Sequence, residues 1–193
     1  MIIVILGAAG SGKTTLRNNL ISKDNRLVKN IGYTSRKPKK EETNGVDYHF
    51  VDKNYFDNNS DIILRRDILN EHYGVSKEAL RKQDLILILD PNGIKELEKS
   101  TKLPISIIHL NFSKKILIQR MLKRGDSLKD IHNRLSADNY ILNCKETFNS
   151  PIIKISDGNE EAVCDNSLKF INSQKQKYTN ILKRLEGLKK SKN

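Results

Sequence analysis

The chain has 193 residues, a length that favours one α/β domain with insertions, and 37% of the residues are hydrophobic, enough for a sizeable core. No run of about 18 apolar residues occurs, so the composition excludes a membrane-spanning helix of the usual length. The formal net charge is +12, but eight Lys and Arg residues against one Glu fall within residues 166–193, where we expect the solvated face of a helix rather than a nucleic-acid site.

Short apolar runs alternate along the chain with segments of helical periodicity, which is typical of a mainly parallel sheet covered by helices. Strands are expected at residues 2–6, 27–31, 85–89, 105–110 and 152–155. Helices are expected at residues 12–22, 92–99, 113–123, 127–143 and 160–188. Polar turns and short aromatic runs interrupt this alternation between residues 34 and 80, which are expected to form an inserted lobe.

The sequence therefore predicts a single domain over residues 1–193, with a core formed by residues 1–33 and 81–193 and a lobe formed by residues 34–80. The two cysteines, Cys144 and Cys164, lack metal-site spacing and are expected to be free thiols in a reducing, cytoplasmic compartment. The sequence leaves open whether the protein is a monomer or a homodimer.

Residues 7–14 read GAAGSGKT and match the phosphate-binding pattern G-x-x-x-x-G-K-[ST] between an expected strand and an expected helix. Glycines in this pattern let backbone N–H groups point at phosphate oxygens, and the helix N-terminus favours an anion. Lys13 is expected to reach the outer phosphates, and the Thr14 hydroxyl is expected to bind Mg²⁺. The pattern predicts a nucleoside triphosphate site formed by Gly7, Ala8, Ala9, Gly10, Ser11, Gly12, Lys13, Thr14 and Thr15.

A second cluster of phosphate-binding side chains follows in residues 34–50, which read TSRKPKKEETNGVDYHF. Arg36 offers a planar fork for a phosphate, Lys39 adds a positive charge, and the Tyr48 hydroxyl adds a neutral donor. A kinase needs such a site because it holds two anionic substrates end to end. The alternative is a basic loop that is merely solvated.

These residues resemble the guanylate kinase family, whose pattern over the same stretch is T-T-R-x-P-R-x-G-E-x-x-G-x-D-Y-x-F. Further along, YGVSKEAL at residues 73–80 resembles the family's Y-G-T-S segment, and RMLKRG followed by NRL resembles its R-L-x-x-R-G…R-L lid. The matches fall in order over most of the chain. The resemblance implies a three-layer P-loop NTPase fold and a nucleoside monophosphate kinase that uses ATP with Mg²⁺.

The resemblance also implies roles for individual residues. Arg36, Lys39, Tyr48 and Tyr73 would hold the acceptor monophosphate. In a lid at about residues 124–134, Arg124 and Arg134 would contact the phosphates, while Arg120, just before it, would lie against the adenine and the triphosphate. With Lys13, these three arginines form the predicted catalytic set, because positioned cations supply most of the catalysis of phosphoryl transfer.

The base pocket departs from the family pattern. Gly32, Leu64 and Val75 stand where the family has polar groups that read guanine, and Asp90 is retained. Ser76 is a further polar candidate, and Asp67 or Glu71 could replace the missing acid. GMP or dGMP is the expected acceptor, and the alternatives are another nucleotide, a ribose phosphate, or a non-catalytic guanylate-kinase-like binding module.

Overall fold

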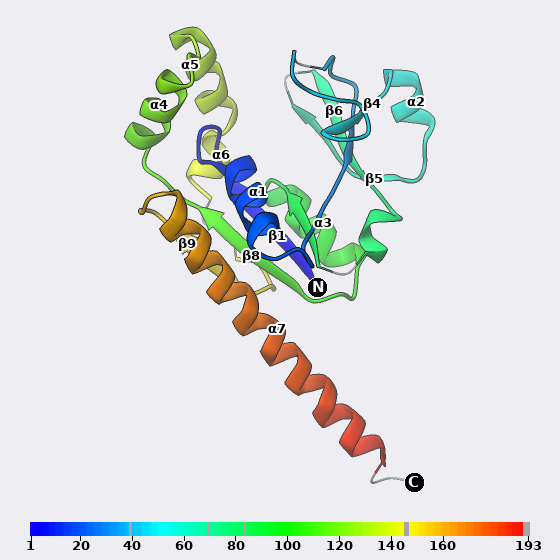
Figure 1. The fold of residues 1–193 in the computed structure, drawn as a ribbon. Coiled ribbons are helices and arrows are strands. Elements are labelled where there is room, and N and C mark those ends of the chain that lie inside the picture. The colour runs from blue at the N-terminus through cyan, green and yellow to red at the C-terminus, as the bar shows by residue number, and fades with distance from the viewer. Residues whose placement is uncertain (39, 69, 83, 145–146, 191–193) are drawn as a thin grey trace.

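The structure, a computed structural model, describes residues 1–38, 40–68, 70–82, 84–144 and 147–190, with backbone only for 187–190. Its centre is a parallel sheet of five strands (Figure 1). In spatial order they are β2 (Val28–Lys29), β7 (Leu85–Ile88), β1 (Ile2–Gly7), β8 (Ile105–Leu110) and β9 (Ile152–Ile155). The predicted α/β fold class is confirmed.

Strand β1 is the middle of this sheet and is buried along its whole length. It pairs with β7 on one side and β8 on the other. A parallel strand covered by helices on both faces has no solvent side, which explains why IIVIL is a continuous apolar run. The loop that follows Gly7 therefore leaves the sheet at its carboxyl edge between β7 and β8, where α/β proteins commonly bind ligands.

Helices cover the two faces of the sheet. On one face, α1 (Lys13–Lys23), α4 (Lys114–Lys123) and α7 (Glu160–Lys190) contribute Leu20, Met121 and Ile171 to one core cluster. On the other face, α3 (Pro91–Ser100) contributes Ile94 and Leu97 to a second cluster. The result is the three-layer arrangement expected from the sequence.

A second sheet lies between β2 and β7 in the chain and has the order β4 (Tyr48–Phe50), β3 (Gly32–Thr34), β6 (Glu71–Ser76) and β5 (Ile62–Ile68). The short helix α2 (Lys53–Asn58) and a 3₁₀ turn at Ala79–Arg81 complete this region. The strand expected at 27–31 is only two residues long, because the chain moves at Gly32 from the first sheet to the second. An added Cβ at Gly32 would lie 3.0 Å from the Gly74 carbonyl oxygen, so the crossing needs a small residue.

The helix expected at 127–143 is divided into α5 (Leu128–Ala137) and α6 (Asn139–Leu142). The division falls at Asp138, whose backbone angles of φ −90° and ψ 7° are not helical. Helices α4 and α5 stand together above the carboxyl edge of the central sheet (Figure 1).

Helix α7 is 31 residues long, and its second half projects beyond the rest of the molecule (Figure 1). Ile171 in the first half is fully buried, whereas Ile181, Leu182 and Leu185 in the second half are exposed. None of the helices in the described ranges combines the length and apolarity needed to cross a bilayer. The described cysteines, Cys144 and Cys164, are free thiols, as expected.

The two halves of α7 should respond differently to the same substitution. Ile171→Ala should cost about 2–5 kcal/mol of unfolding free energy, because it leaves a cavity in the core. Ile181→Ala, with a side chain that is 53% exposed, should cost less than about 0.5 kcal/mol. Urea unfolding followed by circular dichroism measures both, and equal losses would contradict the exposed position of the second half.

Candidate active site

The phosphate-binding loop joins β1 to α1. Gly10 and Gly12 have positive φ angles of 76° and 91°, which residues with side chains rarely adopt, and Gly12 directly precedes α1. The ammonium of Lys13 donates to the carbonyl oxygens of Gly7 at 2.7 Å and Ala8 at 2.9 Å. The loop's own carbonyls therefore hold the lysine over the loop.

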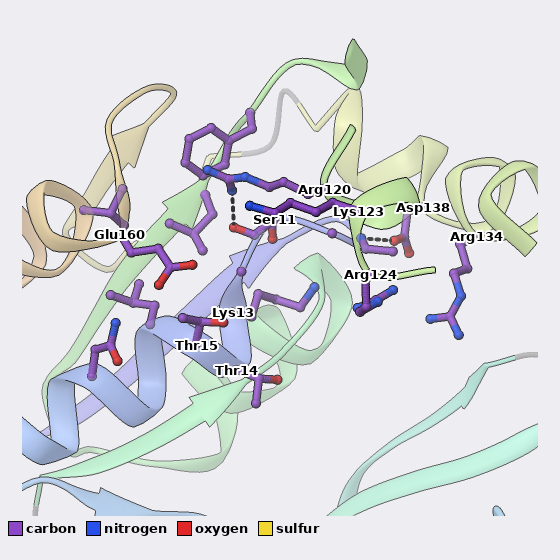
Figure 2. Close-up of a pocket in the computed structure, with 18 of the residues that line it drawn as sticks. Ser11, Lys13, Thr14, Thr15, Arg120, Lys123, Arg124, Arg134, Asp138 and Glu160 are labelled. Carbon is purple, nitrogen blue, oxygen red and sulfur yellow. Dashed lines mark hydrogen bonds between the residues drawn. The ribbon is translucent and has the colours of Figure 1, made fainter. Parts of the chain in front are cut away.

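A cavity of about 790 Å³ lies above the loop. Figure 2 shows side chains from the loop and from α4 and α5 converging on it. Of the predicted triphosphate and catalytic residues, the lining includes Ala9, Gly10, Ser11, Gly12, Lys13, Thr14, Thr15, Arg120, Arg124 and Arg134. Ile68 of β5 also lines it, so the second sheet reaches the same space. The structure thus brings together a loop and three arginines that lie more than a hundred residues apart.

The charge around Lys13 is strongly positive. Burial lowers the pKa of Lys13 to about 8, with Asp138 acting to raise it and Arg124 and Arg134 acting to lower it. Cations held this close to each other repel, and an anion placed among them would remove the repulsion. The cavity is therefore suited to a polyanion such as a triphosphate.

Arg120 and Arg124 are held in different ways. The Arg120 guanidinium donates to the Ser11 carbonyl oxygen at 3.1 Å and lies 4.1 Å from the centre of the Phe112 ring. It therefore fixes the loop to α4, a contact that the sequence did not indicate. Arg124 pairs with Asp126, and this hydrogen-bonded pair raises the pKa of Arg124.

The second predicted cluster gathers on the second sheet. The Arg36 guanidinium lies 5.7 Å from the Tyr48 ring centre, and the Tyr48 and Tyr73 rings are 6.0 Å apart. Both terminal nitrogens of Arg36 donate to the Glu42 carboxylate, at 2.8 and 2.9 Å. Lys39, the fourth member of this predicted set, falls outside the described residues.

Arg17 on α1 is a charged neighbour of this cluster that the sequence analysis missed. Burial lowers the pKa of Arg17, while its neighbours Tyr48 and Asp47 act to raise it. Because Arg17 follows Lys13 by four residues, the two side chains share one face of α1. This spacing of four residues was the signal in the sequence from which Arg17 could have been predicted to lie near the site.

Where the chain departs from the family's base-reading pattern, the residues present, and the polar candidates near them, make contacts within the protein. Leu64 and Val75 are buried in the second core cluster, and the Ser76 hydroxyl accepts a hydrogen bond from the Ala79 N–H at 3.1 Å. Glu71 accepts from the Ser35 hydroxyl at 2.9 Å, and Asp67 contacts His72. Each of these polar groups thus has a partner within the lobe.

Asp90 lies in a network that the sequence did not reveal. One carboxylate oxygen accepts from the Gly93 N–H at 2.6 Å, which caps α3, and from Arg66 Nε at 3.0 Å. The other accepts from the Tyr140 hydroxyl at 2.9 Å, and burial followed by this bond raises the pKa of Tyr140. Arg66 also pairs with Glu96 at 3.0 Å. Arg66 is directed there by a bulge at Leu64, which has a positive φ of 51°.

Thr14 is the predicted metal-binding residue, and its exposed hydroxyl lines the cavity. Within the described ranges, no group of three or more His, Cys, Asp or Glu side chains is placed to hold a metal ion. Mg²⁺ usually takes one or two protein oxygens and completes its shell with phosphate and water. One hydroxyl beside a cavity suited to a polyanion is compatible with this kind of coordination.

Comparison with known proteins supports one family. A family model described as guanylate kinase matches residues 1–174. The guanylate kinase of Neisseria gonorrhoeae is 33% identical over 144 residues, which is 70% of each chain. That of Rickettsia prowazekii is 32% identical over 156 residues, covering 76% of this chain and 79% of that one.

The fold is similar to the crystal structure of guanylate kinase from Anaplasma phagocytophilum, with a TM-score of 0.67 and 20% identity. That similarity covers 90% of this chain and 85% of the other. The sequence matches and the shared fold agree, and the chain belongs to the guanylate kinase family.

Proposed function

We propose that this protein transfers a phosphoryl group from ATP to a nucleoside monophosphate, with GMP or dGMP as the best acceptor. The observation that carries the proposal is the single cavity that Lys13 shares with Arg120, Arg124 and Arg134. Family membership supports this reaction over the alternatives of a binding module or a kinase for other acceptors.

The donor side uses the loop and the lid. The N–H groups of the loop and Lys13 hold the outer phosphates, and the lysine exchanges its bonds to Gly7 and Ala8 for phosphate oxygens. Arg124 and Arg134 stabilise the charge that spreads over the transferring phosphoryl group in the transition state. No general base is needed, because an oxygen of the acceptor monophosphate is already a competent nucleophile.

The acceptor side uses the second sheet. Arg36, Tyr48 and Tyr73 hold the monophosphate, with Lys39 as the fourth predicted member. The bidentate pair with Glu42 fixes the plane of the Arg36 guanidinium but uses both terminal nitrogens, so a phosphate must meet the Nε edge of the guanidinium or displace Glu42. Burial raises the pKa of Tyr48, which keeps its hydroxyl a neutral donor at physiological pH.

Base recognition falls mainly to Asp90. A carboxylate can accept from the N1–H and the exocyclic amine of guanine, an arrangement that adenine and the pyrimidines do not present. However, Asp90 already accepts from Gly93, Arg66 and Tyr140. A base must therefore share or displace one of these contacts, which predicts a weak preference for guanine.

Mg²⁺ bound with ATP would be held in part by the Thr14 hydroxyl and would neutralise phosphate charge. We further propose that the lobe at 34–80 and the lid at 124–134 close over the substrates and exclude water, which prevents wasteful hydrolysis. The cytoplasmic location and the choice between monomer and homodimer stay predictions.

Lys13→Ala should reduce phosphoryl transfer by about 10³-fold, because it removes a charge aimed at the triphosphate. Lys23→Ala, on the same helix but paired with Asp165 on the surface, should change activity by less than about twofold. Coupled-enzyme assays measure the activity of both variants, and an unchanged circular dichroism spectrum shows that each is folded. Normal turnover by Lys13→Ala would rule out the assigned role of the loop.

Arg124→Ala and Arg134→Ala should each lower kcat by about a hundredfold or more, while the KM values for both substrates change by less than about fivefold. The reason is that the lid cations act on charge that develops only in the transition state. Lys129→Ala on α5, whose side chain is exposed, serves as the matched control. A raised KM with normal kcat would mean that the two arginines only bind substrate.

Assays with GMP, dGMP, AMP, CMP and UMP should find GMP or dGMP to be the best acceptor, with a high KM and a preference below about a hundredfold. A full set of matched hydrogen bonds would instead give on the order of 10⁴-fold. An exclusive, tight preference for GMP would mean that Asp67, Glu71 or Ser76 supplies the missing contacts. If none of these five monophosphates is phosphorylated, a ribose phosphate becomes the favoured acceptor.

Tyr140→Phe tests the role of Asp90 in the same assay, because it removes the hydroxyl that donates to Asp90 and so frees one oxygen of the Asp90 carboxylate. The KM for GMP should fall by about two- to tenfold, because the base no longer has to displace that hydroxyl, while the KM for ATP stays constant. If neither KM changes, the base does not contact that oxygen of Asp90.

A further inference from the structure

An exposed apolar stripe runs along the projecting half of α7. It consists of Tyr178, Ile181, Leu182 and Leu185, whose exposed fractions are 37%, 53%, 41% and 52%. Their spacing places all four on one face of the helix. Ile171 lies seven residues before Tyr178 on the same face and is fully buried in the core. The stripe therefore continues the face by which α7 packs on the central sheet, beyond the point where the sheet ends.

A groove of about 580 Å³ lies where the stripe leaves the body of the protein. Tyr178 and Ile181 line it from α7. Residues at the start of β8 also line it, namely Leu103, Pro104 and Ile105. Figure 1 shows α7 running past the N-terminus at this amino edge of the sheet. The stripe thus faces the same side as the folded body and forms an overhang beyond its edge.

The overhang restricts what can cover the stripe. A lipid bilayer is flat on this scale and would meet the body of the protein before it reached the inner side of the overhang. A nucleic acid offers mainly phosphate and sugar to a protein surface, which an apolar stripe does not match. Another helix fits beside α7, because two packed helices lie about 8–10 Å apart.

A second copy of α7 has the required shape. The stripe is symmetric about the point between Ile181 and Leu182, so an antiparallel copy centred there places Tyr178 of each chain opposite Leu185 of the other. Residues 174–190 span about 25 Å of helix, enough for each helix end to reach the groove of the other copy. Both overhangs are then covered by the same contacts, as in a two-fold symmetric pair.

The charges agree with this pairing. The helix end that would enter the groove is basic, with Lys183 and Arg184, and the groove holds the carboxylate of Glu98. Glu98 accepts from the N–H and the hydroxyl of Ser150 at 2.8 and 2.6 Å, and both of these donors are neutral. A cation from the second copy would balance this carboxylate. Lys177 lines the same groove and opposes that gain, so apolar burial is the main contribution.

The apolar area is sufficient for a weak, specific pair. With about 200 Å² of surface for a large side chain, the exposed fractions of the stripe amount to roughly 350 Å² per copy. Two copies, with the walls of the two grooves, reach the roughly 1,000 Å² that a specific interface needs. Because interfaces near this lower limit are typical of reversible association, we expect a Kd of about 10–100 µM.

We propose that the projecting half of α7 pairs antiparallel with α7 of a second copy, which makes the protein a reversible homodimer. The stripe lies at the other end of α7 from Glu160, which lines the cavity above the phosphate-binding loop. The proposal therefore goes beyond phosphoryl transfer and does not depend on it.

Sedimentation equilibrium of the full chain between about 2 and 200 µM tests the proposal. The mass should rise from the 22.1 kDa of one chain toward twice that value. Ile181→Glu places a charge at the centre of the stripe and should weaken association by about thirtyfold or more. Asn180→Glu adds the same charge at an exposed position on the opposite face and should change association by less than about threefold.

Hydrogen exchange gives a second measurement and locates the interface. The amides of residues 178–186 should exchange several-fold more slowly at about 200 µM than at about 2 µM in the wild type and in Asn180→Glu, but not in Ile181→Glu. Circular dichroism shows that each variant is folded. At about 2 µM the chains are separate, so Ile181 is exposed when unfolding is measured at that concentration.

A mass of one chain at every concentration would overturn the proposal. If that monomer bound vesicles containing anionic phospholipid, the stripe would belong to a membrane surface instead. A dimer that Ile181→Glu leaves intact would also overturn the proposal, because the two copies would then meet through another face.

Discussion

Repulsion among cations that converge on one loop is the constraint on which the site depends. Lys13 stands close to Arg124 and Arg134, and burial, together with these two charges, lowers its pKa to about 8. Two of these cations have partners within the protein: loop carbonyls and Asp138 for Lys13, and Asp126 for Arg124. A site that is preorganised in this way gains affinity for a polyanion from the relief of its own repulsion.

Such a cluster needs a rigid base, and the central sheet provides it. Strand β1 is buried along its length and paired on both sides, so the loop after it starts from a fixed point. Helix α4 is attached to the same loop through Arg120, which contacts both Ser11 and Phe112. The loop is therefore held from the sheet below and from the lid side above. Catalytic groups on rigid elements keep their geometry better than groups on mobile segments.

The sequence was sufficient for features that depend on local pattern. Apolar runs located the central strands, and GAAGSGKT located the loop, because both signals lie within a few consecutive residues. The sequence was insufficient where distant side chains meet. The bond from Ala9 to Asp138 spans 129 residues, and the segment around Asp138, where α5 and α6 are separate, was predicted from the sequence as one continuous helix. The ion pairs of Arg66 with Asp90 and Glu96 depend on a β-bulge, and the local sequence pattern did not predict that bulge.

Asp90 shows how a fold and a specificity can compete for one side chain. Asp90, the residue proposed to read guanine, also caps α3 and joins Arg66 to Tyr140. A carboxylate has about four acceptor positions, and three are occupied before any base arrives. Reading both guanine donors therefore requires one of the existing donors to leave. The Tyr140 hydroxyl is the donor whose departure harms the fold least, because Gly93 belongs to a helix cap and Arg66 is tied to Glu96. Under the proposed role of Asp90, base selectivity would be limited by the free energy of exchanging a hydroxyl for a guanine N–H, which is small because each bond replaces another of similar strength.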